Sequence, residues 1–367
     1  MSAGGDRDDL VDLIRGVALV GICCVNLPEM GVSPGDFSPS AHGHDRIADL
    51  LVAGLLIGKS FPLFAFLLGW AIGRRWERET APVFAVRHTR RIAALAVLGL
   101  AHALLVYAGD ILLPYALVSL AIWPLLLLPT AGRLVVAALA LPLSVLTNGI
   151  LGALFFLGGD FHEPSGLAGS FAEATRQRWS DLPDVWASVA LFNLPLAAGA
   201  ALAGAAAAKA GWPRVPVAGP GWLRPAALAL AGLALVTSLA VGGALATLGL
   251  GTAATPWLLA LLAAMAVPQC AGYLLVLGRA HARGWRPTLL MAAGRNSLTC
   301  YVTQGVLAGW AFGGYGLGLF DELGSAALLG LSLAIAVVAA LSALAWERLL
   351  GRGPLELLLA RLTGPRA

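Results

Sequence analysis

Long, uninterrupted apolar stretches dominate the pattern of the chain. Each is rich in Leu, Ala and Val, and there are ten: 10–27, 50–73, 92–108, 111–129, 134–157, 185–208, 225–249, 254–278, 288–312 and 323–346. A helix needs about 20 apolar residues to cross a bilayer, and the alternating pattern of membrane strands is absent. The sequence therefore predicts an all-α, polytopic membrane protein with about ten transmembrane helices. The second stretch is expected to be composite, because Lys59 and Pro62 interrupt it.

The composition and the distribution of charge support this prediction and orient the chain. Hydrophobic residues make up 59% and charged residues only 12%, whereas about a quarter of the residues of a soluble protein are charged. The segment 74–91 holds six arginines, which predicts that it is cytoplasmic. Alternation from there places 19 of the 24 Lys and Arg residues on the cytoplasmic side. Both termini are then cytoplasmic, and the net charge of +4 reflects topology rather than a nucleic-acid partner.

A Pro- and Gly-rich connector divides the predicted spans into two sets of five. It covers 209–224, so that 1–208 forms an N-terminal membrane half and 225–367 a C-terminal membrane half. Two longer loops, 28–49 and 158–184, fall on the outer side. The second of these is expected to include a short helix on the membrane surface.

The first apolar stretch carries polar residues near both of its ends. Asp12 and Arg15 lie near the cytoplasmic end and Asn26 near the outer end. Polar groups in hydrocarbon cost several kcal/mol unless they are paired or hydrated, so they indicate a site. Asn26 is the stronger candidate. Asp12 and Arg15 are expected to support the site, or simply to lie at the water boundary.

Histidines supply the candidates for acid–base chemistry. His102 lies in the outer half of the third span, where an ionisable side chain usually faces a cavity or a partner. Asp110 follows in a turn, where it is either part of the site or a helix N-cap. His42 and His44 lie in the first outer loop, as general bases or as solvated residues. Their short H-x-H-D spacing lacks an obvious third ligand cluster, so no metal is expected.

The ninth span contains too many polar residues for a helix that faces lipid. Arg295 is suited to binding a phosphate through its planar guanidinium, with snorkelling to the headgroups as the alternative. Beyond the spans, a short amphipathic surface helix is predicted from Pro354. The residues of the ninth span considered as a cofactor-binding set are Arg295, Asn296, Thr299, Tyr301 and Gln304.

Five motifs in a fixed order carry a resemblance that spans essentially the whole chain. They are DLIRGVALVGICCVN, GLAHALLVYAGDILLPYAL, GRNSLTCYVTQ, GYGLGLF and GPLELLLARL. In these the sequence resembles the YeiB-like bacterial membrane proteins. Mainly through the first helix, it is also similar to the transmembrane acyltransferase superfamily. That superfamily includes the lysosomal heparan-α-glucosaminide N-acetyltransferase and polysaccharide O-acyltransferases, which use cytosolic acyl-CoA to modify an acceptor across the membrane.

The resemblance implies roles for particular positions. The superfamily pattern of RG followed by a polar catalytic group falls on Arg15 and Asn26. The O-acyltransferases have histidine at the second of these positions, and the glucosaminide enzyme has asparagine. That enzyme also uses a histidine in the following loop, which corresponds to His42 or His44. His102, Asp110, Arg295 and Gln304 match the YeiB-like pattern, which assigns them no role.

The leading hypothesis is a membrane-embedded acyltransferase of a bacterial-type inner membrane. It would move an acyl group, most simply acetyl, from cytosolic acyl-CoA to a hydroxyl or amine on a small-molecule, glycan or lipid-linked acceptor. One of the histidines would be the general base. The expected partners are the lipid bilayer and that acceptor, with a homodimer left open. The alternatives are a small-molecule or lipid transporter or flippase that uses the same polar residues, and a non-catalytic membrane scaffold.

Overall fold

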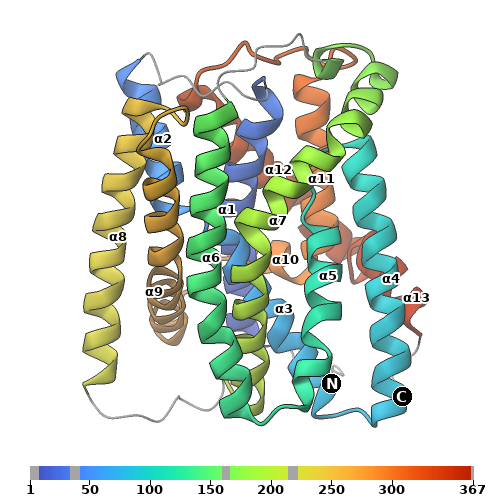
Figure 1. The fold of residues 1–367 in the computed structure, drawn as a ribbon. Coiled ribbons are helices and arrows are strands. Elements are labelled where there is room, and N and C mark those ends of the chain that lie inside the picture. Colours follow the sequence, from blue (N-terminus) through green and yellow to red (C-terminus); the bar gives the residue numbers. More distant parts are fainter. Residues whose placement is uncertain (1–7, 34–41, 159–165, 214–221, 365–367) are drawn as a thin grey trace.

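Helices make up almost all of the described chain, and the described residues contain no strand (Figure 1). The structure is a computed structural model that describes residues 8–33, 42–158, 166–213 and 222–364. Short 3₁₀ helices occur at Pro124–Leu127 and Gly166–Ala168. The α-helices are α1 (Asp9–Gly31), α2 (Gly43–Leu55), α3 (Ser60–Trp76), α4 (Ala81–Leu105), α5 (Leu112–Ile122), α6 (Thr130–Gly158), α7 (Phe171–Lys209), α8 (Leu223–Leu248), α9 (Thr255–Ala282), α10 (Thr288–Arg295), α11 (Ser297–Phe312), α12 (Ser325–Leu350) and α13 (Pro354–Thr363).

The all-α membrane class is confirmed. Seven helical segments among the described residues are long and apolar enough to cross a membrane: α1, α2 with α3, α6, α7, α8, α9 and α12. The other three predicted spans correspond to α4, to the short α5, and to α10 with α11. α4 carries arginines in its first half, and a break at Asn296 divides α10 from α11. The count of ten spans and the cytoplasmic placement of the termini stay predictions.

The second part of the predicted outer loop 158–184 belongs to α7. This helix begins at Phe171 and runs without interruption to Lys209. Its start is fixed by a capping box. The Ser170 hydroxyl accepts the backbone N–H of Glu173, and the Glu173 carboxylate accepts the backbone N–H of Ser170. The described part of this loop is helical at Gly166–Ala168 and from Phe171 onward, and its position on a membrane surface stays a prediction. Residues 214–221 of the predicted linker lie outside the described residues.

α1 lies at the centre of the bundle and packs on α3, α10, α11 and α12. Of its apolar stretch 67% is buried, against 17% for α6, whose side chains face outward. Its contact with α10 depends on two glycines. A Cβ at Gly16 would lie 2.0 Å from the carbonyl oxygen of Leu290, and one at Gly294 would lie 1.8 Å from that of Asp12. Small residues let membrane helices approach this closely, and here they bring elements of the two predicted halves together.

The predicted interruption of the second span is confirmed as a break between α2 and α3. Gly58 adopts a positive φ of 72° there, which glycine tolerates without steric cost. The break frees carbonyl groups at the end of α2, and buried side chains bind them. Lys59 Nζ donates to Ala53 O at 3.0 Å. Gln269 Nε2 donates to Gly54 O at 2.9 Å, and Tyr273 OH to Leu55 O at 2.8 Å. Irregular backbone at this depth is tolerated because protein groups satisfy it.

Candidate functional site

Three helices that are distant in sequence meet around one small cavity. Its lining comes from the last turns of α1, the end of α4 and the segment after it, and the middle of α11. In Figure 1 the second halves of α1 and α4 lie in the upper part of the bundle, beside α11. The cavity has a volume of about 20 Å³, which suffices for a water molecule but not for an organic ligand. Its chemically active lining residues are Asn26, His102, Tyr107, Tyr301 and Gln304.

A histidine–carboxylate pair forms the back of this cavity, which we call the His102 cavity. His102 Nδ1 lies 2.9 Å from Asp110 Oδ1, and the two side chains are 3% and 0% exposed. The turn between α4 and α5 positions Asp110, whose second oxygen accepts the backbone N–H of Leu113 at 2.9 Å. Tyr301 OH donates to Oδ1 at 3.2 Å. Asp110 therefore caps the start of α5 and lies within ion-pair distance of the imidazole, although His102 Nδ1 makes no hydrogen bond with any described residue. Its part in a site stays a prediction.

The other nitrogen of His102 faces into the cavity. Among the described residues, Nε2 is buried and has no hydrogen-bond partner. A Cβ added at Gly305 of α11 would lie 2.5 Å from it, so this glycine makes the space that the nitrogen faces. An imidazole held by a carboxylate at Nδ1, with Nε2 open to a cavity, is arranged as a general base.

Two side-chain amides face the same space and are also unsatisfied. Asn26 Nδ2 and Gln304 Oε1 are buried without a hydrogen-bond partner in the described part of the chain. Most buried polar side-chain atoms in proteins are hydrogen-bonded, so several orphans around one cavity indicate a place for a ligand or water. The cavity thus offers a base, an N–H donor and a carbonyl acceptor.

Glu29 and Tyr107 lie beside this cavity, and the sequence analysis did not place either in the site. Tyr107 lines the cavity and donates from its hydroxyl to the carboxylate of Glu29. Glu29 is exposed and stands three residues after Asn26 on α1. That spacing puts both residues on one helix face, and it is the feature of the sequence from which Glu29 could have been assigned to the site. Glu29 was missed because it was assigned to the first outer loop.

The predicted cofactor-binding set is divided between two places. Tyr301 and Gln304 line the His102 cavity. Arg295, Asn296 and Thr299 lie around the α10–α11 break, which is near mid-height of the bundle in Figure 1. We call this second group, together with its two carboxylates, the Glu356 cluster: Arg295, Asn296, Thr299, Glu347 and Glu356.

Side chains of the Glu356 cluster bind one another. Arg295 Nε lies 2.9 Å from Glu347 Oε1, and Asn296 Nδ2 lies 3.1 Å from Glu347 Oε2. Glu356 on α13 accepts the backbone N–H groups of Leu298 and Thr299 at 2.7 and 3.1 Å. A carboxylate at a helix N-terminus satisfies free N–H groups and the positive end of the dipole. The amphipathic helix predicted from Pro354 is confirmed as α13, and it supplies this cap.

The polar residues at the start of α1 join it to α10. Arg15 donates to the carbonyl of Gly294 at 3.0 Å and lies 3.3 Å from Asp12 Oδ1. Both groups lie far along α1 from Asn26, toward its N-terminal end. They hold the two helices in register, which agrees with the supporting role expected of them.

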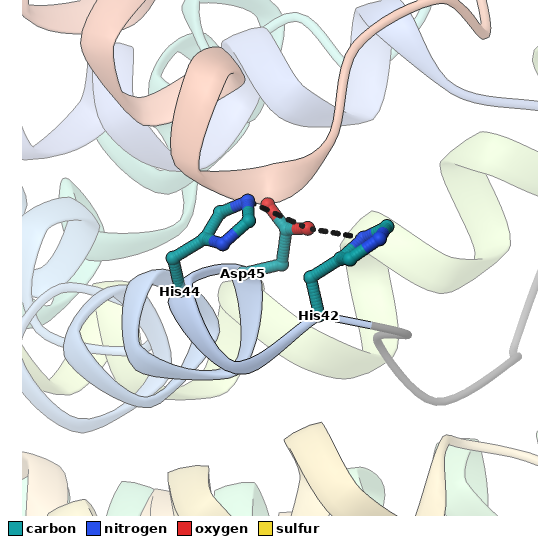
Figure 2. A group of neighbouring side chains, drawn as sticks. All are labelled: His42, His44 and Asp45. Atoms are coloured by element: carbon teal, nitrogen blue, oxygen red, sulfur yellow. Dashed lines mark ion pairs between the residues drawn. The ribbon is translucent and has the colours of Figure 1, made fainter.

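The loop histidines lie apart from the His102 cavity. His42 precedes the first turn of α2, His44 lies within that turn, and neither contributes to the cavity lining. Figure 2 shows their rings on either side of the Asp45 carboxylate. Of the histidines considered as a general base, His102 alone lines the described cavity.

Comparison with known proteins finds similarity without an assigned activity. Residues 207–365 match the family described as "Protein of unknown function (DUF418)". The chain is 34% identical over 131 residues to "Uncharacterized protein YeiB" of Escherichia coli (strain K12), an alignment that covers 33% of this chain and 31% of that protein. It is 26% identical over 403 residues to "Uncharacterized protein YxaH" of Bacillus subtilis (strain 168), covering 96% of this chain and 92% of that protein. No solved structure matches. These findings support the YeiB-like resemblance that the ordered motifs indicate: the chain is similar to YeiB over about a third of its length and to YxaH over nearly all of it.

Proposed function

We propose that the protein is a membrane-embedded acyltransferase with His102 as its general base. The observation that supports this most is the pairing of His102 Nδ1 with Asp110 at 2.9 Å while Nε2 stays open to a cavity lined by Asn26. Neither a lipid-facing helix nor a purely structural pair needs that open nitrogen. The superfamily resemblance of the first helix agrees with this chemistry.

The reaction follows from the groups around the cavity. An acceptor hydroxyl or amine gives its proton to His102 Nε2 as its oxygen or nitrogen attacks the thioester carbonyl carbon of acyl-CoA. The resulting imidazolium is stabilised by Asp110, and the Asn26 amide donates to the developing oxyanion. Collapse of the tetrahedral intermediate breaks the C–S bond. The proton returns from His102 to the leaving thiolate, so that the products are acylated acceptor and free CoA.

The direction of transfer rests on the distribution of charge. The arginine-rich segment 74–91 supports a cytoplasmic position for the lower end of the bundle, where acyl-CoA is available. In this proposal the His102 cavity then lies toward the outer half of a bacterial-type inner membrane. The acceptor is a hydroxyl or amine of a small molecule, glycan or lipid reached from that side. At about 20 Å³, the cavity must widen before it admits a thioester or an acceptor.

Labelled acetyl-CoA tests the proposal directly. Inverted membrane vesicles that contain the full chain receive acetyl-CoA labelled in the acetyl group, and the label in lipid and glycan fractions is measured. We expect transfer with the wild type and with His281→Ala, whose histidine lies at the end of α9, and loss with His102→Ala. If His102→Ala transfers label at the wild-type rate, the proposal is wrong.

A transporter is the second candidate, and the α2–α3 break supports it. Discontinuous helices form substrate sites in many transporters, and this one carries the fully buried Lys59. Flux of a small molecule or lipid through proteoliposomes without acyl-CoA, lost on Lys59→Met but retained on His102→Ala, would favour transport. Acyl transfer that is lost on His102→Ala and retained on Lys59→Met would favour the enzyme.

A further inference from the structure

The first turn of α2 gathers three potential metal ligands away from the His102 cavity. His42, His44 and Asp45 each offer one ligand atom, and these atoms all lie within 4.8 Å of one another. Figure 2 shows the Asp45 carboxylate between the two imidazoles. The H-x-H-D spacing alone had given no obvious third ligand cluster, but the first turn of α2 brings the Asp45 carboxylate between the two imidazoles.

The distances match those in a metal coordination shell. Asp45 Oδ2 lies 3.5 Å from His42 Nδ1 and 3.6 Å from His44 Nε2. Zinc binds nitrogen and oxygen ligands at about 2.0–2.1 Å in a tetrahedron, which separates neighbouring ligand atoms by about 3.3–3.4 Å. Charge-assisted hydrogen bonds between the same groups would be about 2.7–2.9 Å long. The two nitrogen–oxygen distances are therefore closer to the spacing around a shared cation than to that of direct pairing. The two nitrogens lie within 4.8 Å of each other, and the exposed rings can turn to bring them to the same spacing.

The surroundings of the three side chains suit a site that loads from solvent. The side chains of His42 and His44 are 72% and 70% exposed, so an ion reaches them and the rings are free to adjust. Asp45 is 9% exposed, and its other oxygen accepts the backbone N–H of Ala326 at 2.8 Å. That hydrogen bond orients the carboxylate independently of any ion, as partners of metal ligands do.

We propose that His42, His44 and Asp45 bind a zinc-class divalent cation, with the fourth position of the tetrahedron filled by water. Two imidazoles and one carboxylate form a ligand set that zinc uses. Asp45 also accepts the backbone N–H of Ala326 at the start of α12, so the site lies where the first turn of α2 meets α12. The site is independent of the proposed acyl transfer and uses none of the residues of the His102 cavity.

Metal titration of the full chain tests this proposal. The purified protein, without a polyhistidine tag and freed of metal by a chelator, is titrated with Co²⁺, and the visible absorption of tetrahedral cobalt is recorded. We expect saturation at one Co²⁺ per chain, displacement by Zn²⁺, and at least about tenfold weaker binding in His42→Ala and in His44→Ala. His281→Ala should bind as the wild type does. Both loop histidines are exposed, so unchanged unfolding temperatures without metal will show that these variants fold.

Thermal unfolding gives a second measurement. Zn²⁺ should raise the unfolding temperature of the wild type, because a ligand that binds only the folded state stabilises it. It should not raise that of the His42→Ala/His44→Ala double variant. A wild type that gives no saturable cobalt spectrum would overturn the proposal, and so would single variants that both bind with wild-type affinity.

Discussion

The two polar clusters inside the bundle differ in how their hydrogen bonds are satisfied. In the Glu356 cluster, carboxylates bind the arginine, the asparagine amide and two backbone N–H groups. In the His102 cavity, atoms of Asn26, His102 and Gln304 are buried without a partner. An unsatisfied buried polar group costs about 1–3 kcal/mol. The first cluster therefore stabilises the fold, whereas the second carries a cost that a ligand would relieve. A count of polar residues in the sequence does not separate the two.

The largest expected effect is on catalysis in Asp110→Asn. The amide oxygen can still accept the backbone N–H of Leu113, and the amide N–H₂ can donate to the Tyr301 hydroxyl, so the fold should persist, but the neutral amide cannot stabilise an imidazolium at His102. The kcat of acyl transfer should fall about 100- to 10,000-fold. Because Asp110 acts through His102, the KM for acyl-CoA should stay unchanged, and initial rates measure both constants. If the lower kcat is accompanied by a markedly lower unfolding temperature, Asp110 has a structural role instead.

Asn26→Leu should separate function from stability most clearly. Loss of one oxyanion donor lowers the rate about 100- to 1000-fold. Stability should be unchanged or higher, since an apolar side chain of similar size replaces an amide whose Nδ2 has no partner. Initial rates and thermal unfolding on the same preparation test this. A strongly destabilised variant would show that Asn26 is structural and would remove the contrast between the two clusters.

Glu356→Ala should have the opposite result. It removes the acceptor of two backbone N–H groups and of the Thr299 hydroxyl, which should lower the free energy of unfolding by about 1–3 kcal/mol. α13 should detach, and limited trypsin digestion at Arg361 should become faster. Glu322→Ala, at an exposed position, serves as the control. Acyl transfer by the surviving folded protein should change little, and a loss as large as that of Asn26→Leu would contradict the division into two clusters.

The smallest effect is expected from Tyr107→Phe. This change removes the hydroxyl that donates to Glu29 beside the cavity, so that the cavity opens more easily. One neutral-to-charged hydrogen bond contributes about 1.5–3 kcal/mol when buried and less at an exposed carboxylate. The KM for the acceptor should fall by about tenfold or less, with kcat maintained. A fall in kcat would place the Tyr107 hydroxyl in the chemistry itself.

The sequence predicted the helical segments well because the length of each apolar stretch, and the polar residues that interrupt it, determine where a helix begins and ends. The break beside Lys59 and the start of α13 at Pro354 are confirmed. The division at Asn296 was not predicted, because its stability depends on Glu356, which lies 60 residues further along the chain. Likewise, the start of α7 at Phe171 depends on a capping box that lies within a stretch assigned to a loop.

The sequence identified residues of the candidate site better than it predicted which of them lie together. Asn26 and His102 were singled out as polar residues in apolar spans, and they share the cavity. Arg295 was chosen by the same argument, yet it pairs with Glu347. That partner lies at the end of another span, and no local spacing reveals it. Polar residues within apolar stretches are therefore good candidates for a site. Only the three-dimensional structure shows which of these side chains have partners and which face a cavity without one.

The cap on α11 also constrains the order in which the protein matures. The N–H groups of Leu298 and Thr299 are bound by Glu356, so while the ribosome is still making α12 they have no carboxylate to bind. In that interval the two groups must be held by water or by other polar groups. The start of α11 gains its cap only when α13 has been made. A chain truncated before Glu356 would therefore have an uncapped start of α11.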